Sequence, residues 1–435
     1  MSKSEEEKQR FSRRRFLAAS YGMVAAAGLN AKAQTKVLGT TNRVNEPIGG
    51  DTLNATEPFW GEHQGGILTP VQSHTYFASL DLVATKREDV TDMLRAWTSA
   101  AARMADGQTA DPIGQDLSAP GSDSAEAMDL PLARLTVTFG FGAGLFTKDG
   151  QDRYGLAARR PAAFVDLPKF NGDQLVAART GGDLLIQACA NDPQSAFHAV
   201  RQLVRLAYDV AQVRWVQSGF LATTAAQQTP RNLMGFKDGT NNPSSRDAHV
   251  MDKVVWVGDE GPEWMRGGSY VVVRRIRMAL EHWDRMNIGF QEQTIGRSKY
   301  SGCPLGGKKE FDPPDYDATD KDGNLIIAEN AHIRLGAPVN NEGAQILRRP
   351  YSYNDGADFV TERWPPWRQG MEYDAGLLFV CYQSDPRTGF VKVFDKMSKF
   401  DALNQFVTHT GGGLFACPGG VAKGEFIGQR LFASA

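Results

Sequence analysis

Short apolar runs and segments with helical apolar spacing alternate along the first half of the chain. Residues 75–83 (TYFASLDLV) predict a strand, and residues 87–104 carry apolar side chains at the spacing of one helical face. Residues 107–130 are rich in Gly, Pro, Asp and Ser, which predicts a long surface loop. The remaining elements expected in this half are strands over 133–141, 184–189 and 213–220 and a helix over 195–211.

The second half repeats this plan. Its expected elements are strands over 269–278, 375–382 and 413–417, helices over 280–290 and 390–400, and a long Gly/Pro/Asp-rich excursion over 301–323. Because strand, helix, excursion, strand, helix and strand occur twice, the pattern predicts two α+β domains. Each would be an antiparallel sheet with helices on one face. The polar, small-residue stretch 222–232 is the expected boundary.

The N-terminus has the order of parts typical of an export signal. Ser12-Arg13-Arg14-Arg15-Phe16-Leu17 resembles a twin-arginine sequence, an apolar stretch follows, and Ala31-Lys32-Ala33 fits a cleavage site. The alternative is a basic N-terminus beside a chance apolar run. We expect residues 1–33 to be a twin-arginine signal peptide that directs the chain to the periplasm or outside the cell. A linker over 34–57 and domains over 58–225 and 226–435 would follow.

Composition excludes several classes of function. The formal net charge is −2 over 435 residues, so nothing indicates binding to nucleic acid. After the signal, no segment has the roughly 18 uninterrupted apolar residues of a permanent membrane span. The four cysteines are far apart in sequence, which argues against zinc, iron–sulfur and covalent haem sites. His198 falls on the polar side of its predicted helix, so we expect it to be solvated rather than a ligand.

Three segments carry candidate chemistry. Residues 235–243 (GFKDGTNNP) contain Asp238, residues 331–335 (AHIRL) contain His332, and residues 346–353 (ILRRPYSY) contain Arg348 and Arg349. Alone, each has an ordinary interpretation: a surface turn, a core histidine and a basic strand end. Together they supply an acid, an imidazole and a fixed cation, which suits the cleavage of peroxide on a haem.

These segments, in this order, resemble the dye-decolorising (DyP-type) haem peroxidase family, and most closely its exported deferrochelatase branch. Four further segments resemble those of the family: GEHQGGI at 61–67, GGSYVVVRRIRM at 267–278, IGRSKYSGCPLG at 295–306 and GLLFVCYQSDPRTGF at 376–390. The resemblance covers roughly residues 58–430. It implies two ferredoxin-like domains of the dimeric α+β barrel type, which agrees with the repeat, and a homodimer.

The resemblance also implies roles for single residues. His332 would bind the iron of non-covalent haem b as its proximal ligand, and Asp385 would hydrogen-bond the far nitrogen of that histidine. Asp238 would move the peroxide proton on the opposite face of the haem. Arg348 would stabilise the developing charge, with Arg349 as the alternative.

Four further residues complete the expected haem site. Arg297 and Arg334 are candidates for pairing with the haem propionates on chemistry alone. Leu378 and Phe379 would contribute apolar surface to the distal pocket. Pro350 follows the arginine pair where the family often has glycine, so the choice between Arg348 and Arg349 stays open.

The function implied is a haem peroxidase that reduces hydrogen peroxide and oxidises organic donors such as dyes through a ferryl intermediate. One alternative is a deferrochelatase, which releases iron from haem with the porphyrin intact and works with iron-transport components. Another is a haem-binding or delivery protein, which would need His332 but not Asp238 or Arg348. Because a carboxylate remains a base in acid, the peroxidase should have an acidic pH optimum.

Overall fold

The computed structural model describes residues 54–222, 228–361 and 369–433, all of which lie within one compact unit, Arg43–Ala435. The expected signal peptide and most of the expected linker lie outside the described residues. Among the helices within the described ranges, none combines the length and the apolar character needed to cross a membrane.

The first half is a four-stranded antiparallel sheet with two long helices and one helix of four residues. Its strands pair in the order β2-β3-β1-β4, which is the order of a ferredoxin-like βαββαβ unit. The elements are β1 (His74–Leu82), α1 (Arg87–Ala105), β2 (Thr136–Phe141), α2 (Ala143–Phe146), β3 (Leu184–Ala190), α3 (Pro193–Leu206) and β4 (Ala211–Phe220). Helix α3 begins where the Asp192 carboxylate accepts from the backbone N–H of Ser195, which is a typical N-cap.

The second half repeats the unit, with the strand order β7-β8-β5-β9. Its strands are β5 (Ser269–Met278), β6 (Leu347–Arg348), β7 (Tyr351–Thr361), β8 (Gln369–Gln383) and β9 (Val407–Cys417). Its helices are α4 (Ala248–Val254), α5 (Leu280–Trp283), α6 (Ile288–Ile295), α7 (His332–Leu335), α8 (Lys392–Phe400) and α9 (Gln429–Phe432).

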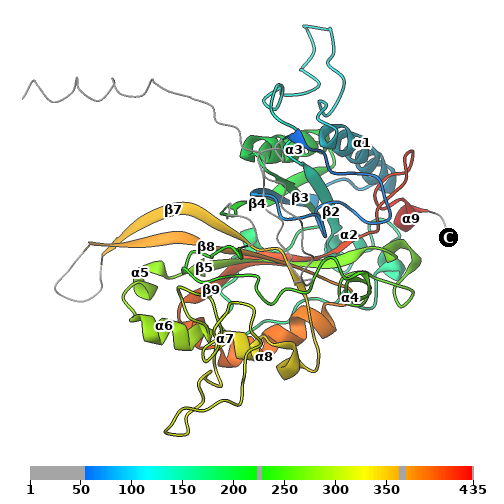
Figure 1. The fold of residues 1–435 in the computed structure, drawn as a ribbon. Coiled ribbons are helices and arrows are strands. Elements are labelled where there is room, and N and C mark those ends of the chain that lie inside the picture. The colour runs from blue at the N-terminus through cyan, green and yellow to red at the C-terminus, as the bar shows by residue number, and fades with distance from the viewer. Residues whose placement is uncertain (1–53, 223–227, 362–368, 434–435) are drawn as a thin grey trace, which may run out of the picture. The chain divides into compact units, whose positions relative to one another are not determined.

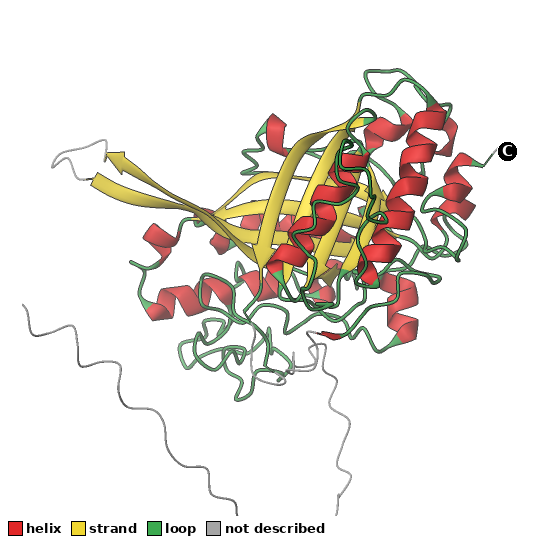
Figure 2. Cartoon of the chain, turned by 90° about the horizontal axis from the view of Figure 1, so that it is seen from above, coloured by secondary structure: helices red, strands yellow, loops and turns green. Residues whose placement is uncertain are grey.

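The two four-stranded units join along both edges. β2 pairs with β9 through Phe141 and Ala416, and β4 pairs with β7 through Phe220 and Ser352. Because β5 pairs with β8 as well as with β9, the sheet of the described residues closes on itself. Helices α1 and α3 cover the outer face of the first unit, and α5 to α8 cover the outer face of the second (Figures 1 and 2). The fold therefore leaves one apolar interior between the two units and a separate layer beneath each set of helices.

Several elements differ from the expectation. The predicted helix 280–290 is divided into α5 and α6 by a turn. Strand β8 begins at Gln369 rather than near residue 375, and it pairs with β7 as a long two-stranded arm that extends beyond the sheet (Figure 1). Helix α3 ends at Leu206, five residues before the expected end.

His198 is not solvated, so that prediction was wrong. Its side chain is buried, with Nε2 3.4 Å from Asp123 Oδ2 and Nδ1 3.2 Å from Glu126 Oε2. Both carboxylates belong to the long loop 107–130, which folds over the polar side of α3. The apolar spacing of α3 could not predict that this loop packs on its polar side, because the loop residues have no regular apolar pattern.

Candidate active site

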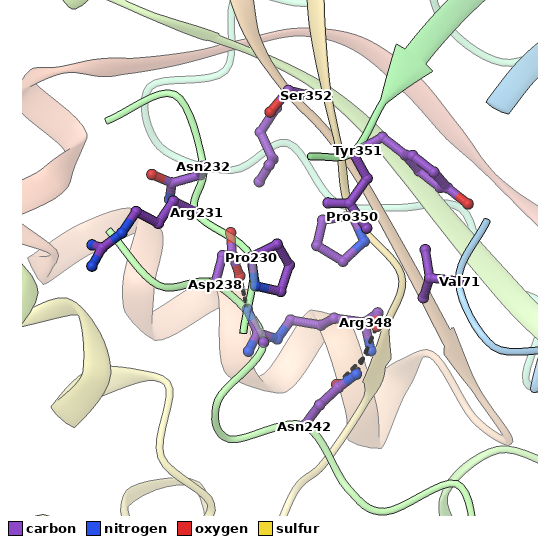
Figure 3. Close-up of a pocket in the computed structure, with 13 residues that line it drawn as sticks. Val71, Pro230, Arg231, Asn232, Asp238, Asn242, Arg348, Pro350, Tyr351 and Ser352 are labelled. Atoms are coloured by element: carbon purple, nitrogen blue, oxygen red, sulfur yellow. Dashed lines mark hydrogen bonds and ion pairs between the residues drawn. The ribbon is translucent and has the colours of Figure 1, made fainter. Parts of the chain in front are cut away.

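Asp238 and Arg348 lie side by side, although 110 positions separate them. Arg348 Nη1 donates to Asp238 Oδ1 over 2.7 Å, and both side chains are mostly buried (Figure 3). Asp238 lies in a turn that folds back on the preceding segment, because its N–H donates to the Pro230 carbonyl over 2.9 Å. The turn needs Gly239, whose φ of 114° disfavours any side chain.

The structure separates the two arginines of the ILRRPYSY segment. Successive side chains of a strand point to opposite faces, so Arg349 faces away from Asp238. It is 2% exposed and donates to the Thr69 carbonyl and to Gln72 Oε1. Arg348 is therefore the arginine beside the acid, and Arg349 ties this segment to the loop before β1.

His332 begins α7, and its partner is Asp401 rather than Asp385. His332 Nδ1 lies 2.7 Å from Asp401 Oδ2, and the Asp401 side chain is 3% exposed. Asp401 ends α8 and caps the short 3-10 segment Ala402–Gln405 by accepting from the Leu403 N–H. Burial of the imidazole would lower the pKa of His332, but the charge and hydrogen bond of Asp401 outweigh it and raise the pKa.

The predicted role of Asp385 was wrong. Its carboxylate accepts from the backbone and the guanidinium of Arg387, with a shortest contact of 2.6 Å. The Asp-Pro sequence after β8 is thus a turn closed by a local ion pair. Asp401 was missed because no sequence pattern links it to His332. The only indication was an acid directly after an amphipathic helix, followed by a turn.

The space around His332 fits an iron ligand. Protein surrounds the residue on most sides, and both Asp238 and Arg348 are near enough to influence its pKa. Even so, 37% of its side chain is accessible, and the hydrogen bonds of the described residues engage only Nδ1. With Nδ1–H held by a carboxylate, Nε2 is left as the free nitrogen that a metal would take.

Arg297 and Arg334 lie in the segments that surround His332. Arg297 is 6% exposed and donates to the carbonyls of Gly302 and Glu310, and Arg334 donates to those of Tyr316 and Ile327. Within the described ranges, neither guanidinium forms an ion pair with a carboxylate. Both keep a charge that haem propionates could use, so their assignment stays a prediction.

Strand β8 presents alternate residues to the site. Leu378 is fully buried in the interior between the two units, so its predicted place in the distal pocket was wrong. Leu377 and Phe379 point to the opposite face and are only partly buried. Leu377 lines the pocket that contains Asp238 and Arg348, and the wall of that pocket is mixed, with Arg231, Asn232, Asn242 and Ser352 among its polar residues. The other apolar wall residues are Val71, Leu221, Pro230 and Pro350.

Comparison with known proteins identifies the family. Residues 64–221 match the N-terminal domain of Dyp-type peroxidases, and residues 229–422 match the C-terminal domain. The protein named deferrochelatase from Escherichia coli strain K12 is 37% identical over 429 residues, which is 97% of this chain and 96% of the relative.

Solved structures agree with these matches. A DyP-type peroxidase from Streptomyces coelicolor is 42% identical with a TM-score of 0.80, covering 89% of this chain and all of the other. A DyP-type peroxidase from Cellulomonas bogoriensis is 39% identical with a TM-score of 0.77, covering 88% of this chain and 99% of the other. The predicted α+β fold is confirmed. This chain belongs to the Dyp-type peroxidase family, as its ordered segments predicted.

Proposed function

We propose that this chain is a haem-dependent peroxidase that reduces hydrogen peroxide and oxidises organic donors. Haem b would be held without a covalent bond between His332 and the Asp238–Arg348 pair. The observation that carries the proposal is the contact of Asp238 with Arg348 at a position from which both influence the pKa of His332.

Each residue has a defined task in this proposal. Bound haem supplies the iron and the electrons that cleave the O–O bond. His332 would hold the iron through Nε2, and Asp401, which binds Nδ1, would fix the ring in that tautomer and increase its electron donation. Asp238 takes the proton from the near oxygen of peroxide and returns it to the departing oxygen. Arg348 holds the peroxide and stabilises the charge that develops on it.

Absorption spectroscopy of the full mature chain tests the proposal. Titrated haem should give a Soret band, which one equivalent of peroxide should change and a reducing dye should restore. His332→Ala should lose the ligated spectrum. Asp238→Asn and Arg348→Leu should keep it, with a peroxide reaction about 100-fold or more slower. A Soret band indifferent to peroxide in the wild type would contradict the peroxidase proposal.

Release of iron from haem is the second candidate, because the Escherichia coli relatives carry the name deferrochelatase. The same pocket would serve both reactions. Incubation with haem, followed by fluorescence of the extracted porphyrin, separates them. Metal-free porphyrin would support iron release, and intact haem after many peroxide turnovers would oppose it. Simple haem delivery is less favoured because it gives Asp238 and Arg348 no task.

We also propose that residues 1–33 export the chain by the twin-arginine route to the periplasm or beyond. The support is the sequence order of the basic, apolar and cleavage segments. Arg13→Lys combined with Arg14→Lys should leave the precursor inside the cell, as fractionation would show.

Iron-transport components and a second copy of the chain are the proposed partners, and sedimentation of the mature protein tests the homodimer.

A further inference from the structure

Asn242 makes two hydrogen bonds to the backbone of Arg348. Its Nδ2 donates to the Arg348 carbonyl over 2.7 Å, and its Oδ1 accepts from the Arg348 N–H over 2.8 Å (Figure 3). One carboxamide therefore satisfies both backbone polar groups of the residue whose side chain reaches Asp238.

The position of Arg348 in β6 explains why it needs such a partner. β6 has two residues and pairs with β8 along one edge, where the next residue, Arg349, donates its N–H to the Val380 carbonyl over 2.8 Å. In an antiparallel pair, the backbone groups of alternate residues point away from the partner strand. Those of Arg348 thus point outward, and the carboxamide of Asn242 takes the place that a neighbouring strand would fill.

Asn242 is also linked to Asp238 through the turn that contains both residues. Asn242 follows Asp238 by four positions, and its own N–H donates to the Gly239 carbonyl over 3.0 Å. A closed ring results: the turn joins Asp238 to Asn242, the carboxamide joins Asn242 to the Arg348 backbone, and the guanidinium returns to Asp238. We infer that Asn242 is a positioning residue that fixes the distance between the proposed acid–base group and the proposed distal cation.

This inference rests on the proposed function. Arginine has a long, flexible side chain, so its guanidinium is accurately placed only when its backbone is fixed. A displacement of about 1 Å at reacting groups can lower a rate about 100-fold. Asn242 itself need not contact peroxide, because it acts through Arg348.

The experiment compares Asn242→Ala with Asn241→Ala, its exposed neighbour, in the full mature chain. Hydrogen exchange of the haem-free protein reports the clamp directly. The peptide that contains residues 346–350 should exchange faster in Asn242→Ala and normally in Asn241→Ala. In the haem-loaded protein, Asn242→Ala should slow the peroxide reaction about 10- to 100-fold with an unchanged Soret band. In the Arg348→Leu background, the same change should add little further loss.

The outcomes separate the two claims. Faster exchange with a normal peroxide rate overturns the positioning role, as does a full second loss in the Arg348→Leu background. A wild type that binds haem but ignores peroxide overturns the proposed function, and the inference with it. If Asn242→Ala fails to fold, Asn242→Asp replaces it: it keeps an acceptor for the Arg348 N–H but loses the donor, so a normal peroxide rate there also overturns the inference.

Discussion

The pairing of His332 with Asp401 decides how the proposed iron ligand behaves. A buried carboxylate 2.7 Å from Nδ1 holds the ring orientation and makes Nε2 a stronger electron donor. Asp401→Asn should therefore weaken haem affinity or peroxide activity about 10- to 100-fold and raise the reduction potential of the iron. Stopped-flow spectroscopy and a potentiometric titration measure these effects. Asp385→Asn is the matched control, and an equal loss there would contradict the assignment.

Two adjacent leucines should respond differently to truncation. Leu378 is fully buried between the two units, so Leu378→Ala should lower the free energy of unfolding by about 2–5 kcal/mol. Leu377 lines the pocket beside Asp238, so Leu377→Ala should cost less stability and should instead change the peroxide reaction or the size of accepted peroxides. Denaturant titration and steady-state kinetics distinguish the two. Equal stability losses with unchanged kinetics would argue against the two opposite faces of β8.

At the residue scale, the sequence could predict those candidate site residues that lie within recognisable sequence motifs. Asp238, His332 and Arg348 are such residues: the structure pairs Asp238 with Arg348, and both influence the pKa of His332. Asp401 was missed because its partnership depends on how the end of α8 packs beside α7, which no local pattern encodes. The prediction that Leu378 lines the pocket was wrong by one position, because a continuous apolar run does not reveal which face of a strand meets the cavity.

At the element scale, the loop 107–130 is fastened to α3 by charges. Burial would raise the pKa of Glu126, but its contacts with Ser124, His198 and Arg201 outweigh it and lower the pKa to about 2. Because the pKa of Glu126 is lower in the folded protein, its ionised carboxylate stabilises the folded loop at pH values above the ordinary pKa of 4.5. This stabilisation is lost as the pH falls toward 2. Because the side chain of its partner Arg201 is 48% exposed and solvent screens that charge, the contribution of Glu126 should be on the order of 1 kcal/mol or less.

Limited proteolysis of loop 107–130 with pepsin, which is active in acid, measures this effect. Cleavage should increase between pH 4.5 and pH 2 beyond the increase in the protease's own activity on an unfolded peptide. Glu126→Gln should raise cleavage at pH 4.5 and flatten the further rise. A Glu126→Gln variant with the wild-type pH profile would show that the ion pairs do not hold the loop.

The order of elements was predictable because strands β2, β3 and β5 are buried on both faces and form nearly continuous apolar runs, whereas α1 and α3 each bury one face. The lengths of the elements were harder to predict than their order. In the β7–β8 arm, Phe359 is 74% exposed and Met371 is 40% exposed, so neither side chain reports a buried surface. Alternation of apolar and polar residues fails in such an arm, and only the part of β8 that contacts β5 gave a clear pattern.

At the scale of the whole molecule, the two units share one interior. Phe77, Leu185 and Trp215 from the first unit pack in the same cluster as Val271, Val273 and Leu378 from the second. The backbone edges also meet at two seams, β2 with β9 and β4 with β7. Sequence showed the repeat of the units, but it contained no sign of which faces and edges meet. The residues proposed to bind haem belong to the second unit, yet they depend on the first for a complete core.

The separated halves should therefore fail where the intact chain succeeds. Residues 226–435 alone would expose the apolar inner face of their sheet and two unpaired strand edges, which favours aggregation. We expect this fragment to be insoluble or to give no Soret band with haem, and co-expression with residues 58–225 to restore the band. The intact mature chain should unfold in a single cooperative transition by calorimetry. A soluble C-terminal half that binds haem as tightly as the full chain would show that the shared interior is not required for the site.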